Sequence, residues 1–172
     1  MSHEGLPDWR VEKSAISASK LGHEVIFAGR KSPVSYDRKI FLKIYEVNWT
    51  AKARLGIPFY WRTVKKQIEK LIRDVKPDIV HAHNIFSAKM ISEFGVPFVY
   101  DDHEYWSRSS RLLIEMVEKL TFRKKTKADI AKYIAVDLPI HLRRIFINRY
   151  IISLWTNWEK ELVSSTPTIT VS

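Results

Sequence analysis

The chain has 172 residues, no cysteine and a formal net charge of +10. This length suits one domain with a core large enough to fold without covalent links, and the lack of cysteine excludes disulfides, zinc–thiolate sites and cysteine nucleophiles. No apolar run reaches the ~20 residues of a membrane-spanning helix, and the positive charge favours an anionic partner such as nucleic acid, a membrane surface or a phosphorylated substrate.

The first predicted element is a helix over 9–21, which Asp8 caps and Gly22 ends. One face of this helix carries small and apolar residues at helical spacing, namely Val11, Ala15, Ala18 and Leu21. The preceding loop, HEGLPDWR at 3–10, is a candidate anion site because backbone amides at a helix start bind phosphate or carboxylate. Gly5 permits close backbone approach, and Arg10 can add a charge-assisted bond. The alternative is that Asp8 is only a cap, since the three-glycine dinucleotide pattern is missing.

Strands and helices then alternate as far as residue 101. Strands are predicted over 23–29, 39–47, 78–82 and 97–101, and helices over 60–75 and 85–94. In the second strand, Ile40, Leu42 and Ile44 are expected to share the inner face. Gly or Pro stands at each switch, which predicts an α/β fold with a doubly wound, Rossmann-like parallel sheet covered by helices on both faces.

The remainder of the chain is mainly helical from 108 to 164, and a last strand, TITVS, follows. We expect residues 1–172 to form a single Rossmann-like domain that carries a basic, mainly helical insert at 107–154. Residues 1–3 are too short and polar for a good opening strand, and no helix follows the last strand. These two features predict that the chain is part of something larger.

Polar side chains follow two of the predicted strands. His83 and Asn84 end the third strand, and four more polar residues end the next strand: Asp101, Asp102, His103 and Glu104. Ligands of open α/β sheets bind outside the carboxyl ends of the strands, so these groups are expected to converge on one crevice. At such strand ends His83 and His103 can act as base, hydrogen-bond donor or metal ligand.

A metal site is the alternative interpretation of the same strand ends. It requires at least three ligands from one set: His81, His83, Asp101, Asp102 and His103. Strand alternation puts His81 and His83 on the same side, which makes this arrangement feasible. We nevertheless expect no metal here and interpret His81 as a core histidine that bonds a neighbouring carbonyl group.

The helical segment near the carboxyl end is basic and rich in aromatic residues. Its candidate anion-binding side chains are Arg123, Lys124, Lys125, Lys127, Arg143, Arg144 and Arg149. Basic residues beside an apolar aromatic stripe suit an anionic membrane interface, whereas the alternative is a core-facing stripe with a solvated basic face. No nucleic-acid recognition motif is present. We therefore expect a cytoplasmic protein, peripheral at the inner membrane face, that binds no nucleic acid.

Six stretches occur in a familiar order: HEGLPDWRVEKSA, LGHEV, KPDIVHAHN, GVPFVYDDHEYW, WEKELV and TITVS. Together they resemble the amino-terminal, acceptor-binding domain of a retaining GT-B glycosyltransferase of family 4. The resemblance implies transfer of a sugar from a nucleotide-sugar donor to a lipid or saccharide acceptor. It also implies that a carboxyl-terminal domain, which this sequence lacks, binds most of the donor, and that the chemistry needs no metal or other cofactor.

The resemblance also assigns roles to individual residues. Gly5 resembles the glycine loop near the donor phosphates, with Arg10 following it, and His83 beside Asn84 matches the region near the reacting sugar. The strand end that lines the acceptor side corresponds to Asp102, His103 and Glu104. We expect the chain alone to be inactive without a donor-binding domain or partner chain. The alternatives are a non-catalytic sugar- or phosphate-binding regulatory module and a sugar-nucleotide epimerase.

Overall fold

The computed structural model describes residues 1–32, 35–36, 39–102, 138–165 and 168–170, and the side chains of 138–145 and 168–170 lie outside this description. The chain divides into two compact units. Unit 1 comprises Met1–His103 and Leu162–Ser172, and unit 2 comprises Glu104–Glu161. Each unit is described by itself.

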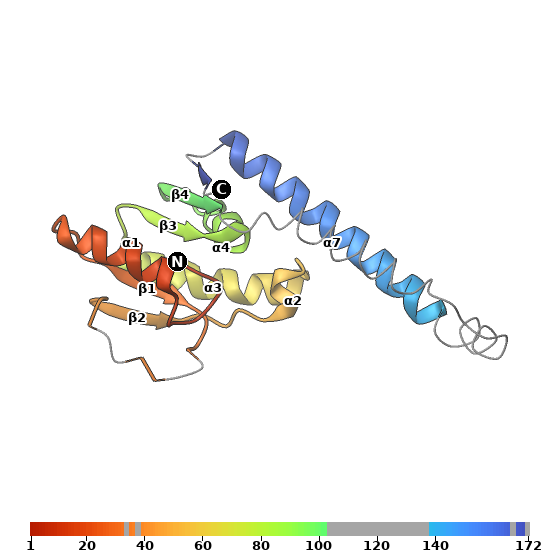
Figure 1. Cartoon of the computed structure of the whole chain (residues 1–172), viewed down its shortest axis with the longest axis horizontal. Helices are drawn as coiled ribbons and strands as arrows, with labels where there is room; N and C mark the ends of the chain where they lie inside the picture. Colours follow the sequence, from red (N-terminus) through yellow and green to blue (C-terminus); the bar gives the residue numbers. More distant parts are fainter. Residues whose placement is uncertain (33–34, 37–38, 103–137, 166–167, 171–172) are drawn as a thin grey trace. The chain divides into compact units, whose positions relative to one another are not determined.

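Helices and strands are interspersed through unit 1, as the sequence predicts, although the first two strands follow one another with no helix between them among the described residues (Figure 1). The elements in chain order are α1 (Trp9–Lys20), β1 (Ile26–Gly29), β2 (Lys43–Glu46), α2 (Ala51–Arg54), α3 (Pro58–Val75), β3 (Val80–His83), α4 (Asn84–Ile91), β4 (Phe98–Asp102) and β5 (Thr168–Thr170). The prediction of an α/β fold is confirmed, and only the short helix α2 has no counterpart among the predicted elements.

The strands form two parallel sheets. β1 pairs with β2, and β4 lies between β3 and β5 in the second sheet. Parallel strands need helical crossovers to connect them, and α3 and α4 lie between successive strands in the chain. The carboxyl ends of β3, β4 and β5 therefore point the same way, which is the arrangement that brings polar strand ends together.

The amino-terminal residues link the two sheets through backbone hydrogen bonds. Ser2 donates its N–H to Ala28 of β1 at 3.0 Å, and His83 of β3 donates to the carbonyl oxygen of Met1 at 2.9 Å. Ser2 also forms a parallel bridge with His83. Although this segment is short and polar, it lies between β1 and β3 and is hydrogen-bonded to both. The doubly wound arrangement, with helices on both faces, stays a prediction.

Helix α1 begins where the sequence indicates. The Asp8 carboxylate accepts hydrogen bonds from the backbone N–H groups of Arg10 and Val11, at 3.0 and 3.4 Å, so the predicted cap is confirmed. Val11 is buried, as expected for the inner face, but Leu21 is 78% exposed. The predicted apolar face is therefore wrong at its last position, because the helix has ended at Lys20.

The segment predicted as the second strand, 39–47, presents the opposite face from the one predicted, and β2 itself spans only Lys43–Glu46 of it. Leu42 and Ile44 are 66% and 40% exposed, whereas Phe41 packs against the core cluster of Leu6, Val11 and Phe27. Side chains alternate across a strand, so an error of one residue in the register exchanges the two faces. The prediction that Ile40, Leu42 and Ile44 point inward is wrong at Leu42 and Ile44 for this reason.

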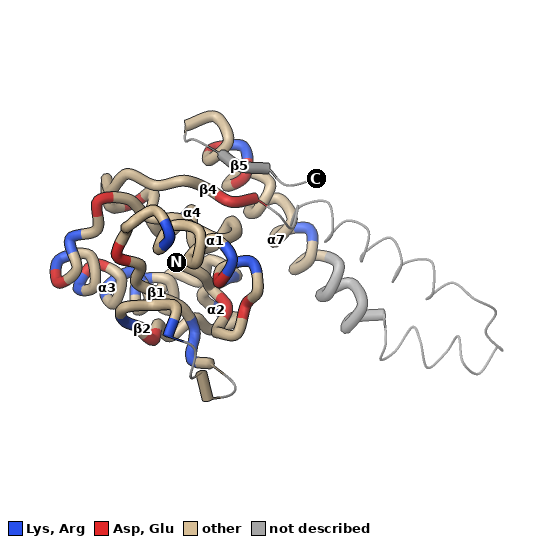
Figure 2. The backbone as a smooth tube through the Cα atoms, turned by 60° about the vertical axis from the view of Figure 1, so that its left-hand side comes forward, with Lys and Arg blue, Asp and Glu red and all other residues tan. Residues whose placement is uncertain are grey.

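Helix α3 separates apolar from basic side chains. Val64 and Ile68 are fully buried, while four basic residues of the helix are exposed: Arg62, Lys66, Lys70 and Arg73. Figure 2 marks basic residues in blue along the backbone of α3. Pro58 occupies the first turn, where its missing N–H costs no helical bond. This division is that of a helix which covers a core with one face and meets solvent with the other.

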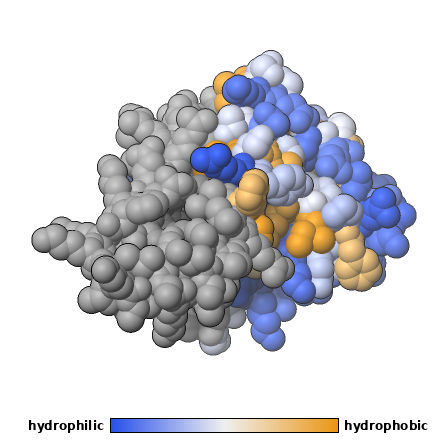
Figure 3. Space-filling model, turned by 90° about the vertical axis from the view of Figure 1, so that its right-hand side faces the viewer, coloured by the Kyte–Doolittle hydropathy of each residue, from blue (hydrophilic) through white to orange (hydrophobic). Residues whose placement is uncertain are grey.

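Unit 2 is described only where helix α7 (Leu138–Ser165) passes through it, up to Glu161. From Phe146 onward its side chains are described, and several large hydrophobic ones are exposed. Hydrophobic side chains also lie exposed among hydrophilic ones on the described part of the face in Figure 3. Within the ranges given above, no helix is both long and apolar enough to cross a membrane.

Candidate functional site

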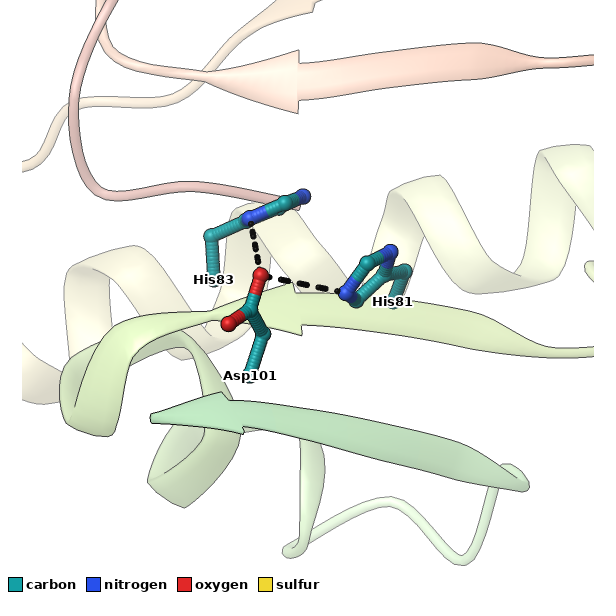
Figure 4. A group of neighbouring side chains, drawn as sticks. All are labelled: His81, His83 and Asp101. Atoms are coloured by element: carbon teal, nitrogen blue, oxygen red, sulfur yellow. Dashed lines mark ion pairs between the residues drawn. The ribbon is translucent and has the colours of Figure 1, made fainter. Parts of the chain in front are cut away.

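The polar ends of β3 and β4 lie side by side. Residue pairing along the two parallel strands places His83 opposite Asp101 and His81 opposite Val99. Side chains two residues apart on a strand share a face, so His81, His83 and Asp101 all project from the same side of the sheet. Figure 4 shows one oxygen of the Asp101 carboxylate paired with both imidazole rings. The convergence predicted from the sequence is thus present for His83 and Asp101, and His81 joins them.

One carboxylate oxygen of Asp101 serves both histidines. Its Oδ2 atom lies 3.0 Å from Nδ1 of His83 and 3.4 Å from Nε2 of His81 (Figure 4). The two imidazole rings stack with their centroids 4.2 Å apart. An ionised carboxylate can only accept hydrogen bonds, so Nδ1 is the nitrogen of His83 that carries the proton. Its Nε2 then carries a lone pair and can accept a hydrogen bond.

His83 is a neutral side chain at physiological pH. It is 3% exposed, and burial lowers its pKa from 6.5 to about 4, although the hydrogen bond to Asp101 opposes this shift. A buried imidazole loses more hydration when charged than when neutral, which is the physical cause. His83 can therefore orient a ligand hydroxyl group through its lone pair, but it does not present a positive charge.

His81 differs from its predicted role. Its side chain is 38% exposed, and its Nε2 atom faces a carboxylate instead of a backbone carbonyl group. The interpretation as a core histidine is wrong, because residue 81 lies on the same face as His83, and that face is open at this position. Which of the two carboxylates lies beside His81 could not be derived from the sequence, since the register between β3 and β4 sets it.

A second polar cluster lies beside the first, around the start of α4. Asn84 adopts a left-handed backbone conformation with φ of 66°, which non-glycine residues seldom adopt and asparagine tolerates best. Its side-chain amide contacts Nδ1 of the buried His3, and Nε2 of His3 lies 2.9 Å from the Glu4 carboxylate. Arg54 of α2 also lies 3.8 Å from Glu4. Strained backbone of this kind is often kept at functional sites.

Gly5 is held between backbone segments. A Cβ atom at this position would lie 2.8 Å from the carbonyl oxygen of Lys31 and 2.9 Å from that of Arg30. Gly29 faces the same segment, because a Cβ there would lie 2.6 Å from the carbonyl oxygen of Glu4. The close approach that Gly5 permits is thus an approach to the end of β1. Its role near donor phosphates stays a prediction.

The start of α1 is already satisfied by its own cap. Asp8 takes up the N–H groups of Arg10 and Val11 and brings a negative charge to the helix start. An external phosphate at these two amides would have to displace that carboxylate. The Arg10 guanidinium lies over the ring of Trp9, with its central carbon 5.6 Å from the ring centroid. The structure therefore supports the cap interpretation of this loop.

The remaining predicted site residues are distributed as follows. Asp102 is 5% exposed and, by strand alternation, projects from the opposite face to Asp101. Arg149 is exposed on α7. The others lie outside the described residues or side chains: His103, Glu104, Arg123, Lys124, Lys125, Lys127, Arg143 and Arg144. His3 and Glu4 were not singled out individually, although the loop that contains them was.

Comparison with known protein families identifies the family of this chain. The model of glycosyltransferase family 4 matches residues 14–146, which include β1 to β4 and the cluster of His81, His83 and Asp101. No curated protein and no solved structure matches the chain. The matched segment covers well over half of the 172 residues. This chain therefore belongs to glycosyltransferase family 4.

Proposed function

We propose that unit 1 is the acceptor-side half of a glycosyltransferase that moves a sugar from a nucleotide-sugar donor to a saccharide or lipid acceptor. The observation that carries the proposal is His83, a buried and neutral imidazole at the carboxyl end of a parallel strand. Asp101 fixes its orientation and tautomer from the neighbouring strand. Ligands of α/β sheets bind at this end of the strands.

The role proposed for His83 is positioning through its Nε2 lone pair. A sugar hydroxyl group can donate a hydrogen bond to this atom, while Asp101 prevents the ring from turning away. A polar group held in place before the reaction stabilises the transition state without the cost of reorganising during it. In a retaining transfer the donor phosphate helps to deprotonate the acceptor, so unit 1 need not supply a nucleophile. Asp102, His103 and Glu104 are proposed to line the acceptor side.

The function is tested with two proteins, the 172-residue chain and the product of its complete coding region. Each is incubated with nucleotide-sugars and a panel of saccharide and lipid acceptors, and the release of nucleoside diphosphate is measured. We expect acceptor-dependent release only when a donor-binding domain is present. If no acceptor stimulates release above hydrolysis, while saccharides still bind the chain, a non-catalytic sugar-binding module becomes the better description.

We further propose that helix α7 contributes an anionic membrane contact in unit 2. Phe146 and Tyr150 are 72% and 59% exposed and lie four residues apart, with the exposed Arg149 between them. Residues at this spacing share a face of the helix. Aromatic rings beside basic groups suit the boundary between lipid headgroups and acyl chains, and the net charge of +10 favours anionic lipids.

A double change, Phe146→Ser with Tyr150→Ser, is expected to lower binding to phosphatidylglycerol vesicles at least ~10-fold at low salt. Partial burial of two aromatic rings stabilises the bound state by more than ~1.4 kcal/mol, which corresponds to that factor. The measurement is co-sedimentation with vesicles. Phe59→Ser is the matched control, because Phe59 is 73% exposed but lies on α3 in unit 1. Equal loss for both variants, or no binding of the unchanged chain, would disprove the contact.

A further inference from the structure

Three groups with metal-ligand chemistry meet on one face of the β3–β4 pair. The nitrogen atoms of His81 and His83 and a carboxylate oxygen of Asp101 all lie within 4.8 Å of one another (Figure 4). Two of the three come from β3 and the third from its neighbour β4, so the backbone hydrogen bonds of the sheet hold their spacing. Two imidazoles and one carboxylate are the protein ligands of many zinc sites.

We propose that His81, His83 and Asp101 bind a divalent transition-metal ion of the Zn²⁺ class, with the remaining coordination position taken by water or a ligand. Ligand atoms bound ~2.0–2.1 Å from Zn²⁺ on neighbouring corners of a tetrahedron lie ~3.3–3.4 Å apart. The two nitrogen–oxygen distances, 3.0 and 3.4 Å, lie close to this value. Two of the three distances between ligand atoms therefore need to change little when the ion binds.

The third distance, between the ligand nitrogens of His81 and His83, can change when a metal ion binds. His81 is 38% exposed, so its ring can turn about its side-chain torsions without disturbing the core. The Nε2 atom of His81 is itself covered, and its contact with Oδ2 of Asp101, at 3.4 Å, is longer than an ordinary hydrogen bond. A covered polar atom with only this long contact is incompletely satisfied, and a metal ion placed between the two groups would bond both of them.

The ligand set also indicates which ions are expected. Imidazole nitrogen suits zinc, cobalt, nickel and copper, whereas Mg²⁺ and Ca²⁺ prefer sites made wholly of oxygen atoms. Two imidazoles and a single carboxylate thus select against Mg²⁺. This inference does not rest on the proposed transfer reaction. Because the family resemblance implies metal-independent chemistry, the ion is proposed as a regulator or a structural element and not as a cofactor of transfer.

A bound metal ion would change whether His83 accepts a hydrogen bond from a sugar or donates one to it. With the proton on Nδ1, as the 3.0 Å contact with the Asp101 carboxylate indicates, Nε2 is an acceptor. A metal ion at Nδ1 takes the place of that proton, and the proton of the neutral ring then resides on Nε2. The same nitrogen becomes a donor. This consequence, unlike the metal site itself, rests on the function proposed for His83.

The metal site is tested by Co²⁺ titration of the 172-residue chain, prepared without a histidine tag and stripped with a chelator. We expect visible absorption bands of four-coordinate Co²⁺ that saturate at one equivalent and are displaced by Zn²⁺ but not by Mg²⁺. His81→Gln is expected to weaken Co²⁺ binding at least ~10-fold, since even loss of a group behind a ligand costs ~10–100-fold. Circular dichroism of the metal-free protein checks that each variant is folded.

His23→Gln is the matched control, because His23 is exposed in the turn after α1 and lies outside the cluster. Asp101→Asn is a second variant that changes the carboxylate. Absence of Co²⁺ and Zn²⁺ uptake by the unchanged chain overturns the inference, and so does equal weakening by His81→Gln and His23→Gln. An active transferase that binds neither ion would refute the metal site alone. A chain that binds Co²⁺ but belongs to an inactive protein would refute the transfer function alone.

Discussion

Replacing His83 with alanine is expected to lower kcat of the complete transferase by ~10²–10³-fold, the range found when one preorganised hydrogen-bonding group is removed from an active site. The imidazole is held by Asp101 at 3.0 Å and is neutral because burial lowers its pKa to about 4. Its loss removes the acceptor at Nε2 and leaves Asp101 without this partner. The measurement is initial-rate kinetics on folded protein, with folding checked by circular dichroism.

The variant His83→Asn distinguishes the roles of the two ring nitrogens. The asparagine amide can still donate to Asp101 from about the place of Nδ1, but it has no atom at the place of Nε2. We therefore expect His83→Asn to be nearly as slow as His83→Ala, and the exposed His23→Ala to be unchanged. Near-normal turnover of His83→Asn would show that His83 only anchors Asp101.

The pH dependence gives an independent check on the same residue. The folded pKa of His83 lies below its ordinary value of 6.5, so the unfolded state binds more protons when the pH falls below 6.5. The contribution of neutral His83 to stability is present above that pH and decreases as the pH falls towards about 4. Turnover should accordingly show no titration of His83 near pH 6.5. A titration there that disappears in His83→Asn would contradict the neutral assignment.

Gly5→Ala is expected to lower the free energy of unfolding by ~1–3 kcal/mol, the usual cost of forcing an extra group into a packed site. The new methyl group would lie 2.8 and 2.9 Å from two backbone carbonyl oxygens, which cannot turn aside as a flexible side chain can. The segment from Ser2 to Glu4 would have to move away from the end of β1, where Glu4 accepts a hydrogen bond from Arg30. Urea denaturation of both proteins measures the difference.

Gly22→Asn is the matched control for this change. Gly22 has φ of 88° and nothing within 4 Å of its Cβ position, and asparagine tolerates the left-handed region better than most residues. We expect a change of only a few tenths of a kcal/mol. If Gly5→Ala instead leaves stability unchanged but raises KM for the nucleotide-sugar, Gly5 contacts the donor as the family resemblance implies, and the packing explanation is wrong.

Local sequence patterns were sufficient for much of the fold. Asp8 was recognisable as a cap because a carboxylate just before an apolar helical repeat satisfies free N–H groups, and it does so here. Alternating helices and strands likewise predicted parallel pairing, which β3 and β4 show. The inner face of the segment 39–47 was missed because Phe41, Leu42 and Ile44 are all apolar, so hydrophobicity alone does not decide which of them packs on the core.

The sequence alone determined that an apolar strand ends in His83 and Asn84, that a second one ends in acidic residues, and that the family is glycosyltransferase family 4. Only the tertiary structure decided that Asp101, and not Asp102, faces His83, and that His81 shares the same carboxylate oxygen. The physical reason is register. Strand alternation is readable within one strand, but the offset between two strands is set by backbone hydrogen bonds and packing across the sheet.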